Sequence, residues 1–333
     1  MLDKLCMKFI RYKILLLIIC SLLLSAFPLV ITSRYFIRIA IVCLMYAMLV
    51  LSLNLMSGML GLISFGHAAF WGIGAYTAAI LATKIGLTSD ITFIAAGLIA
   101  GCFGFLLSLP VLNLKGYYFT IVTMVFCLII QIVEKNWMGL TGGMLGIKAI
   151  PSPRFFGLAI TTQVSFYYLI LVMAAITVII IRNIMNSRVG IAVLAIRDDS
   201  LAAEAMGVNI FKYKAMIIVI SAMIAGVAGA FYAQYTSYID PTIFSNDQSN
   251  IMLLMAIFGG LGNILGSIIG AVILSVLPEV LRDFAQYRQI TYGALLIALM
   301  LLKPEGLLGS INFKYIGQRL NASKTLDGGM KNE

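Results

Sequence analysis

Charged side chains are scarce in this 333-residue sequence, where Asp, Glu, Lys and Arg together make up only 11% of the residues. Soluble globular domains carry about 25% charged residues, so the composition excludes an ordinary soluble domain. The hydrophobic share is 62% and the mean hydropathy is +1.04. The apolar residues form continuous runs and lack the alternation over about 10 residues that marks a membrane β-barrel. We therefore predict an all-α, polytopic helical membrane protein.

Histidine and paired cysteine are also nearly absent. The chain has a single histidine, and its five cysteines are scattered without a C-x-x-C pair. Metal sites need several such ligands close together in the sequence or the fold. We therefore predict neither a metal site nor a redox site, and we expect no cofactor.

Sequence motifs for catalysis are missing as well. The chain contains no G-x-x-x-x-G-K-[ST] phosphate loop. Residues 142–148 (GGMLGIK) resemble one only superficially, because the lysine does not directly follow a glycine and no Ser or Thr comes after it. No Ser–His–Asp or paired-carboxylate arrangement can be argued within the apolar runs. We predict that the chain is not an enzyme, and that any ATP hydrolysis belongs to a separate subunit.

The apolar runs give nine candidate membrane segments. They are residues 14–31, 36–56, 61–83, 91–112, 117–133, 165–181, 215–238, 250–281 and 290–302. A basic start followed by an apolar run also fits a signal peptide, but no A-x-A-like cleavage site follows the first run. We therefore favour a retained first span.

The distribution of charge along the sequence predicts how the chain is oriented in the membrane. The net charge is +10, and the basic residues lie mainly in short loops and in both tails. In a soluble protein this charge would suggest nucleic acid, but here it fits the positive-inside rule and contact with anionic lipid, so we expect no nucleic-acid partner. We predict a cytoplasmic N-terminus (1–13), a membrane domain (14–302) and a basic cytoplasmic tail (303–333). The longest external loop is predicted at residues 134–164.

The predicted number of membrane crossings conflicts with the predicted location of the two ends of the chain. Two cytoplasmic ends require an even number, whereas simple counting gives nine. Either residues 61–83 or residues 250–281 therefore do not form one clean crossing. Gly259, Gly260 and Gly262 interrupt the later run, which makes it our first candidate for a re-entrant or broken segment. Eight crossings plus a re-entrant pair, or ten crossings with one segment split, would place both tails in the cytoplasm, so we predict about 8–10 transmembrane segments.

Small residues recur at helical spacing and predict close helix packing. Gly97, Gly101 and Gly104 form one such set, and Gly226 and Gly229 lie near the middle of another segment. A further ladder is formed by residues 262, 266 and 270, all glycine. Small side chains at this spacing let helix backbones approach one another.

Ionisable side chains are rare inside the predicted spans. Six runs contain none: 14–31, 91–112, 117–133, 165–181, 215–238 and 250–277. Ion-coupled carriers usually need such groups in the membrane. His67 is the one intramembrane candidate that we consider, and we favour a hydrogen-bonded packing role for it over proton carriage. The energy for transport should therefore come from another subunit.

A polar island at residues 183–214 interrupts the apolar sequence. Asp198, Asp199 and Ser200 predict a helix start, and Gly207 predicts its end about two turns later. The apolar positions of this short helix, residues 201, 205 and 208, fall on one face. Helices shorter than roughly 12 residues are marginal alone, so this helix should dock onto something. An ordinary connector on the membrane surface is the simpler alternative, and a docking helix for a cytoplasmic partner is the sharper one.

A membrane domain with a docking helix and no ATPase motif suggests the permease subunit of an ATP-binding-cassette importer. Residues 58–76 (GMLGLISFGHAAFWGIGAY) resemble the hallmark of branched-chain amino acid importer permeases, and the resemblance is closest to the M-type leucine/isoleucine/valine subunit. Further blocks resemble the family in the same order, at residues 115–123, 136–147, 187–209, 258–263 and 303–309. The match therefore covers roughly residues 40–310. One departure concerns the Glu-Ala-Ala start of the general coupling motif, which reads Leu-Ala-Ala-Glu-Ala at residues 201–205.

The resemblance implies a five-part machine in the cytoplasmic (inner) membrane of a bacterium. Its partners would be two ABC ATPases, a second homologous permease and an extracytoplasmic substrate-binding protein. It also implies that residues 184–212 form the coupling loop to an ATPase. We assign this coupling role to Arg197, Asp198, Asp199, Ala203, Glu204 and Gly207. The hallmark segment would line or gate the pathway, or simply pack closely, and its candidate residues are Gly61, Ser64, Gly66, His67, Phe70, Gly72, Gly74 and Tyr76.

Three alternatives remain open at this point. An importer permease for urea, short amides or another small solute such as a sugar would share the glycine-rich architecture. A secondary amino acid carrier would need the intramembrane charges that the predicted spans lack. A membrane-embedded enzyme would need catalytic groups clustered at one depth, and we find none.

Overall fold

The computed structural model describes residues 27–28, 33–111, 117–155, 158–280, 293, 297, 301–303 and 306–307. Six helical segments in this part of the chain are long and apolar enough to cross a membrane. Five of them consist mainly of α2 (Arg34–Asn54), α4 (Ser89–Val111), α5 (Tyr117–Asn136), α7 (Gln163–Asn186) and α10 (Ile210–Thr236). The sixth combines α3 (His67–Ile80) with the π-helix η2 (Leu81–Ile85). This confirms the predicted class of polytopic helical membrane protein.

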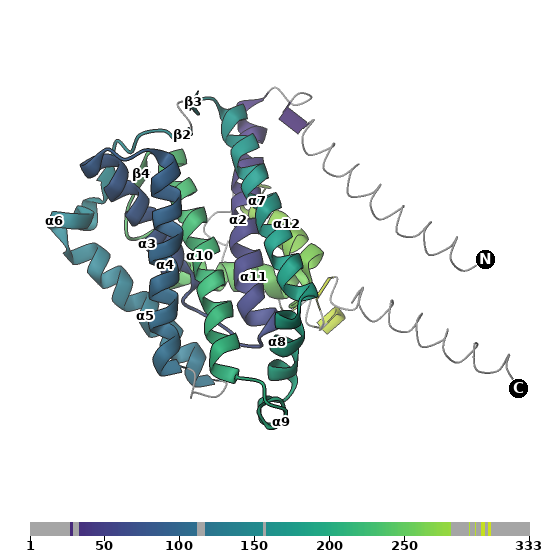
Figure 1. The fold of residues 1–333 in the computed structure, drawn as a ribbon. Coiled ribbons are helices and arrows are strands. Elements are labelled where there is room, and N and C mark those ends of the chain that lie inside the picture. The colour runs from purple at the N-terminus through teal and green to yellow at the C-terminus, as the bar shows by residue number, and fades with distance from the viewer. Residues whose placement is uncertain are drawn as a thin grey trace, which may run out of the picture.

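Helix α10 lies at the centre of the bundle and contacts α4, α3 and α2 (Figure 1). Glycine makes these contacts close, as the small-residue pattern predicts. A Cβ on Gly101 would lie 2.6 Å from Met223 Cγ, and one on Gly104 would lie 2.7 Å from Ala222 Cβ, both on α10. Tight contact between helix backbones supplies dispersion energy that lipid cannot replace.

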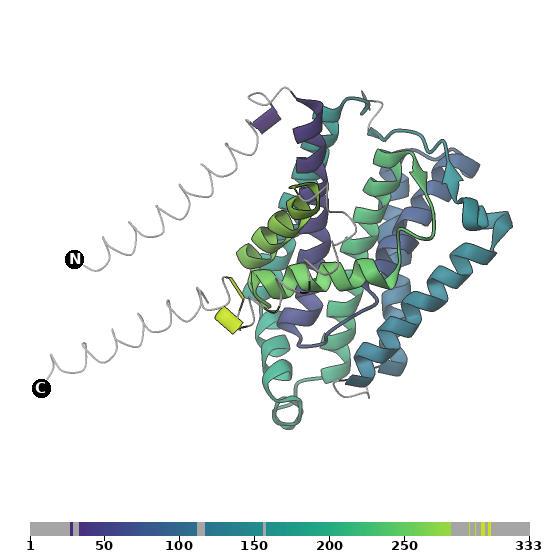
Figure 2. The same ribbon diagram turned by 180° about the vertical axis from the view of Figure 1, so that it is seen from behind.

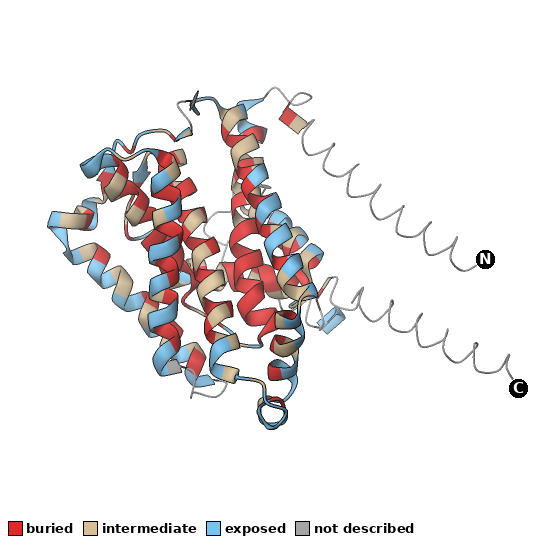
Figure 3. Cartoon of the chain, in the orientation of Figure 1, coloured by how far each residue is buried: buried red, intermediate tan, exposed pale blue. Residues whose placement is uncertain are grey.

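A second group of helices packs around α2. Helix α7 lies along one side of α2 and α12 (Ile264–Val280) along another. The middle and end of α2 are buried almost completely, including Leu49, Val50, Leu53 and Asn54 at 0% exposure. Large apolar side chains of α4, α5 and α7 face outward instead (Figure 3), as expected for surfaces that contact lipid or another subunit.

The predicted break in the run 250–281 is confirmed. Helix α11 (Asn246–Gly259) ends at Gly260, which has φ +112°, and α12 begins at Ile264. Helix α11, at 14 residues, is shorter than a full span and runs across the direction of the long helices (Figure 2). The two helices cross where Gly259 meets Gly266 backbone to backbone. The glycine ladder thus holds a broken segment together.

The start of the third predicted segment is wrong. Residues 61–66 are not helical, and α3 begins only at His67. Before it, a π-helix, η1 (Leu55–Met59), continues α2. Gly61 has φ +76°, a left-handed conformation that ends this helical stretch, and an irregular link then leads to α3.

The predicted loop at residues 134–164 is shorter than expected and is structured. Helix α5 continues to Asn136 and α7 begins at Gln163. Between them lie α6 (Met138–Thr141), the 3-10 turn η3 (Gly143–Leu145), and strands β1 (Ile147–Lys148), β2 (Arg154–Phe155) and β3 (Leu158–Ala159). Strand β1 pairs antiparallel with β4 (Tyr238–Ile239), and β2 pairs with β3. These strands lie at the end of the bundle opposite to α8 and α9 (Figure 1).

The polar island contains more helix than the sequence predicts. Helix α7 ends at Asn186 and is followed at once by α8 (Arg188–Asp198), which the sequence reasoning missed, and then by α9 (Ser200–Ala205). Ser187 begins α8 by accepting a hydrogen bond from the Val189 N–H at 3.2 Å. Most of the predicted span 14–31, most of the segment 290–302 and most of the tail lie outside the described residues, so the total of 8–10 crossings stays a prediction.

Candidate coupling and pathway sites

Helix α9 begins and ends as its sequence predicts. Asp199 Oδ1 accepts hydrogen bonds from the N–H groups of Leu201 at 2.9 Å and Ala202 at 3.1 Å. At the other end, Gly207 has φ +84° and donates its N–H to Glu204 O at 2.9 Å. A side-chain cap at the start and a left-handed glycine after the end define a short, rigid helix.

The side of α9 that packs inward is not the predicted face. Ala203 is buried, whereas Leu201 is 69% exposed and Ala205 is exposed too. The helix therefore contacts its own chain through Ala203, and Val208, which follows it, is half-buried. Met206, at the tip of the loop, is 85% exposed. In the part of the chain that the structure describes, Leu201 in the first turn of the predicted docking face is largely uncovered.

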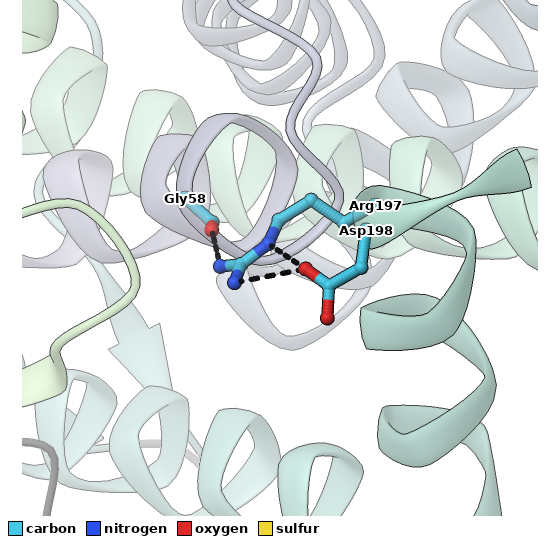
Figure 4. Close-up of polar contacts among 3 residues, drawn as sticks. All are labelled: Gly58, Arg197 and Asp198. Carbon is cyan, nitrogen blue, oxygen red and sulfur yellow. Dashed lines mark hydrogen bonds and ion pairs between the residues drawn. The ribbon is translucent and has the colours of Figure 1, made fainter.

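Arg197 differs from the other predicted coupling residues because its side chain, 39% exposed, bonds to the backbone of a distant helical segment (Figure 4). Its Nη1 donates to the carbonyl oxygen of Gly58 in η1 at 3.0 Å. Its Nη2 and Nε both lie 3.4 Å from Asp198 Oδ1, while the Asp198 side chain is 71% exposed. A Cβ on Gly61 would lie 2.8 Å from Arg197 Cγ, so the missing side chain leaves room for the arginine stem. Arg197 thus connects α8 to the irregular link before α3.

Gly58 is also close to the break between α11 and α12. Asn54 Oδ1 accepts a hydrogen bond from Gly262 N–H at 2.8 Å, and Asn54 Nδ2 donates to Asn263 O at 3.3 Å. A Cβ on Gly58 would lie 2.9 Å from Gly262 Cα. The end of α2, the broken segment and α8 therefore meet at one cluster, which we call the Asn54–Gly58 hub (Asn54, Gly58, Arg197, Gly262 and Asn263).

His67 is fully buried at the first position of α3. Its Nε2 lies 2.7 Å from Ser52 Oγ on α2, and its ring makes an edge-to-face contact with Phe70. The next residue, Ala68, donates its N–H to Ser249 Oγ of α11 at 2.8 Å. His67 thus links α3 to α2, while its Nδ1 has no hydrogen bond from any described residue, so the packing role favoured from the sequence stays a prediction.

The candidate pathway residues are mostly buried within the single chain. Gly61 is exposed, and the other seven (Ser64, Gly66, His67, Phe70, Gly72, Gly74 and Tyr76) are buried. Gly74 of α3 lies against the backbone of Gly226, and a Cβ on Gly229 would lie 2.6 Å from the Ala75 nitrogen. In this conformation the segment forms a closed helix crossing, and a pathway along it would require α3 and α10 to separate.

The sequence reasoning missed a buried carboxylate. Glu134 was predicted to be the first residue of an external loop, which left His67 as the one intramembrane candidate. Because α5 continues for three residues beyond Val133, Glu134 lies inside the helical span and is only 4% exposed. No described residue forms a hydrogen bond to either of its side-chain oxygens. The sequence signal is the helix-compatible continuation Glu-Lys-Asn after Val133, although its polarity alone predicts the end of the span.

The fold and these sites define a class: a polytopic helical membrane protein whose glycine-packed bundle carries a short capped helix at one end. Residues 35–303 of the chain match a family model described as "Branched-chain amino acid transport system / permease component". The chain belongs to this family, since the match covers most of its length.

Named relatives agree with this assignment. The chain is 33% identical over 299 residues to the high-affinity branched-chain amino acid transport system permease protein LivM of Escherichia coli K12, covering 83% of this chain and 70% of the relative. It is 27% identical to the LivH permease protein of Salmonella typhimurium, covering 79% of this chain and 91% of the relative. A probable LivM of Methanocaldococcus jannaschii is 23% identical over 66% of this chain and 67% of its own. No solved structure matches the chain significantly.

Proposed function

We propose that the chain is the transmembrane permease subunit of an ATP-binding-cassette importer for leucine, isoleucine and valine. The observation that carries this proposal is the family match over residues 35–303, which spans the whole glycine-packed bundle and the loop containing α9. The proposed location is the cytoplasmic membrane. The chain supplies the path, and a partner ATPase supplies the energy.

Two different permeases form the proposed pathway. Relatives named LivM and LivH both align with most of this chain, at 33% and 27% identity. This supports a pair of homologous but distinct subunits. Two ATPases on one side and a soluble substrate-binding protein on the other complete the proposed machine.

The proposed coupling runs from α9 into the bundle. Leu201 and Met206 offer an exposed apolar surface to an ATPase, and Asp199 and Gly207 keep the helix rigid. A push on α9 moves α8, and Arg197 transmits that movement to Gly58. From there it reaches the broken segment and the link to α3. Sliding of α3 against α10 at their glycine crossings then opens one side of the bundle and closes the other.

Gly207 offers a direct test of docking. Replacing it with Val forces a β-branched side chain into φ +84°, which costs about 1 kcal/mol or more and misaligns the end of α9. No heavy atom lies within 4 Å of the position of an added Cβ, so the bundle itself should stay intact. We expect uptake and substrate-stimulated ATP hydrolysis to fall several-fold with an unchanged amount of folded subunit. Wild-type values for both rates would contradict the docking role.

The function itself is tested by purifying the subunit from its native membrane with whatever accompanies it. Two ATPases and a second permease are expected, and the reconstituted assembly should take up leucine, isoleucine and valine only with ATP and binding protein. ATP-dependent uptake of urea, with no uptake of branched-chain amino acids, would favour the amide importer instead. Uptake by the isolated chain in vesicles without ATP would favour a secondary carrier.

A further inference from the structure

Glu134 is a buried acid without a partner. It lies near the end of α5, 4% exposed, and both carboxylate oxygens lack a hydrogen bond from any described residue, including the adjacent Lys135. Burial of an unpaired, ionised carboxylate is strongly unfavourable, so such a group is either neutralised by a proton or meets a positive charge. Its position therefore calls for an explanation beyond packing.

The space beside Glu134 is made by a glycine of the hallmark segment. A Cβ on Gly72 would lie 2.8 Å from Glu134 Oε1 and 3.0 Å from Phe244 Cβ. Any larger residue at position 72 would displace the carboxylate or the aromatic ring. The carboxylate is thus directed at the backbone of α3 and not at the surface of the bundle.

Phe244, whose Cβ lies beside the same glycine, belongs to a cluster of aromatic rings. Trp71 lies 4.9 Å from the Tyr232 ring and 4.8 Å from the Phe244 ring, and Tyr76 lies 5.9 Å from Phe244. Two further polar atoms are buried here without partners, Trp71 Nε1 and Tyr76 Oη. Aromatic faces next to a carboxylate are the surroundings that bind an ammonium group, through ion pairing and cation–π attraction.

Phe244 fills the centre of this cluster, and it is carried by a turn. The residue is 1% exposed and belongs to the turn that follows β4 and precedes α11. Side chains of α5 hold this turn, through Gln131 Nε2 donating to Pro241 O at 3.0 Å and Cys127 Sγ to Phe244 O at 3.7 Å. The turn is not part of a long helix, so displacing Phe244 would break these contacts but no turn of a long helix.

We propose that Glu134, together with Trp71, Tyr76 and Tyr232, forms a binding site for the α-ammonium group of the transported amino acid. The site rests on the proposed function and adds a substrate contact to it. In the conformation described here, the Phe244 ring occupies the site. When the turn at residues 240–245 moves away, the ammonium group takes the place of the ring, pairs with the carboxylate and lies against the remaining aromatic faces.

The test compares Glu134→Gln, which keeps the shape and removes the charge, with the wild-type assembly. Radiolabelled leucine binding is measured by equilibrium dialysis on the full membrane complex without binding protein. We expect at least a tenfold weaker affinity in the variant and partial recovery in Glu134→Asp. Isoamylamine, which keeps the ammonium group, should compete in the wild type, whereas 4-methylpentanoate, which lacks it, should not.

The control is Glu279→Gln, which removes a carboxylate that already has a hydrogen-bond donor, Tyr35 Oη at 2.6 Å. It should bind leucine as the wild type does. Wild-type affinity in Glu134→Gln, competition by 4-methylpentanoate alone, or no leucine binding to the wild-type complex would each overturn the site. The proposed function is judged separately, by ATP-driven leucine uptake of the wild-type assembly with its binding protein; if that uptake is absent, the function fails whatever Glu134 does.

Discussion

At the scale of single residues, the most demanding positions are glycines at which two backbones touch. Gly74 of α3 and Gly226 of α10 face each other, and a Cβ on Gly226 would lie 2.7 Å from Ala96 O on α4. The close packing of α3, α10 and α4 therefore depends on having glycine at positions 74 and 226. Such contacts are rigid, because displaced backbone shifts a whole helix, whereas a displaced side chain only changes its rotamer.

Gly74→Ala should destabilise the subunit by about 2 kcal/mol or more, because overpacking of this kind costs roughly 1–3 kcal/mol. The matched control is Gly139→Ala, since nothing lies within 4 Å of a Cβ at that position. Thermal unfolding of the purified protein in detergent measures the difference. Equal melting temperatures for the two variants would show that α3 and α10 are not held together at this crossing.

Arg197 is the second residue whose role depends on its surroundings. Arg197→Ala removes the charge-assisted hydrogen bond to Gly58, an interaction of about 1.5–3 kcal/mol. We expect a folded complex whose leucine uptake falls roughly tenfold while basal ATP hydrolysis continues. The control is Arg188→Ala, at the exposed start of α8. Equal uptake in both variants would remove Arg197 from the transmission route.

At the scale of elements, two short helices decide how the chain connects to its surroundings. Helices α8 and α9 follow α7 without a long loop, so a displacement at α9 is passed on through rigid backbone. The broken pair α11 and α12 contributes the other side of the Asn54–Gly58 hub. The end of α2, the break between α11 and α12, and helix α8 thus meet at this hub. The middle parts of the long helices, by contrast, contact one another mainly through packing.

The cap of α9 can be tested separately from its docking. Asp199→Ala removes the side-chain acceptor for two N–H groups and should weaken the helix by about 1 kcal/mol. We expect amide hydrogen exchange in residues 201–206 to quicken about fivefold. Asp198→Ala is the control, because that side chain pairs with Arg197 and does not cap α9. If both variants exchange alike, Asp199 is not the cap in solution.

At the scale of the whole molecule, the two structured ends lie on opposite sides of the bundle. The strands and α6 lie at one end, and α8 and α9 at the other (Figure 1). The positive-inside pattern predicts that the first end is external and the second cytoplasmic. The direction of import depends on this orientation, because substrate has to arrive opposite to the ATPase.

Orientation is measured with two cysteines in a background that lacks the native ones. Met138→Cys reports on the predicted external end and Met206→Cys on the predicted cytoplasmic end, at side chains that are 80% and 85% exposed. A membrane-impermeant maleimide applied to intact spheroplasts should label position 138 alone. After lysis it should label both. Labelling of position 206 in intact spheroplasts would reverse the predicted topology.

The sequence by itself determined the class of protein, most of the long helices, the break near Gly260 and both ends of α9. These features follow from local causes: apolar runs of spanning length, a capping carboxylate, and glycine at positive φ. The sequence also indicated the family, through blocks in the right order.

Only the tertiary structure decided which groups meet. Local pattern could not show that Arg197 turns inward to Gly58, or that Ala203 and not Leu201 packs against the bundle, because both depend on neighbours distant in the chain. Glu134 is the clearest case. A polar residue at the end of an apolar run predicts a water-exposed end, but α5 continues past it, and the carboxylate is buried against Gly72 of α3. Burial is a property of the packed helices, and so the polarity of a single residue does not determine it.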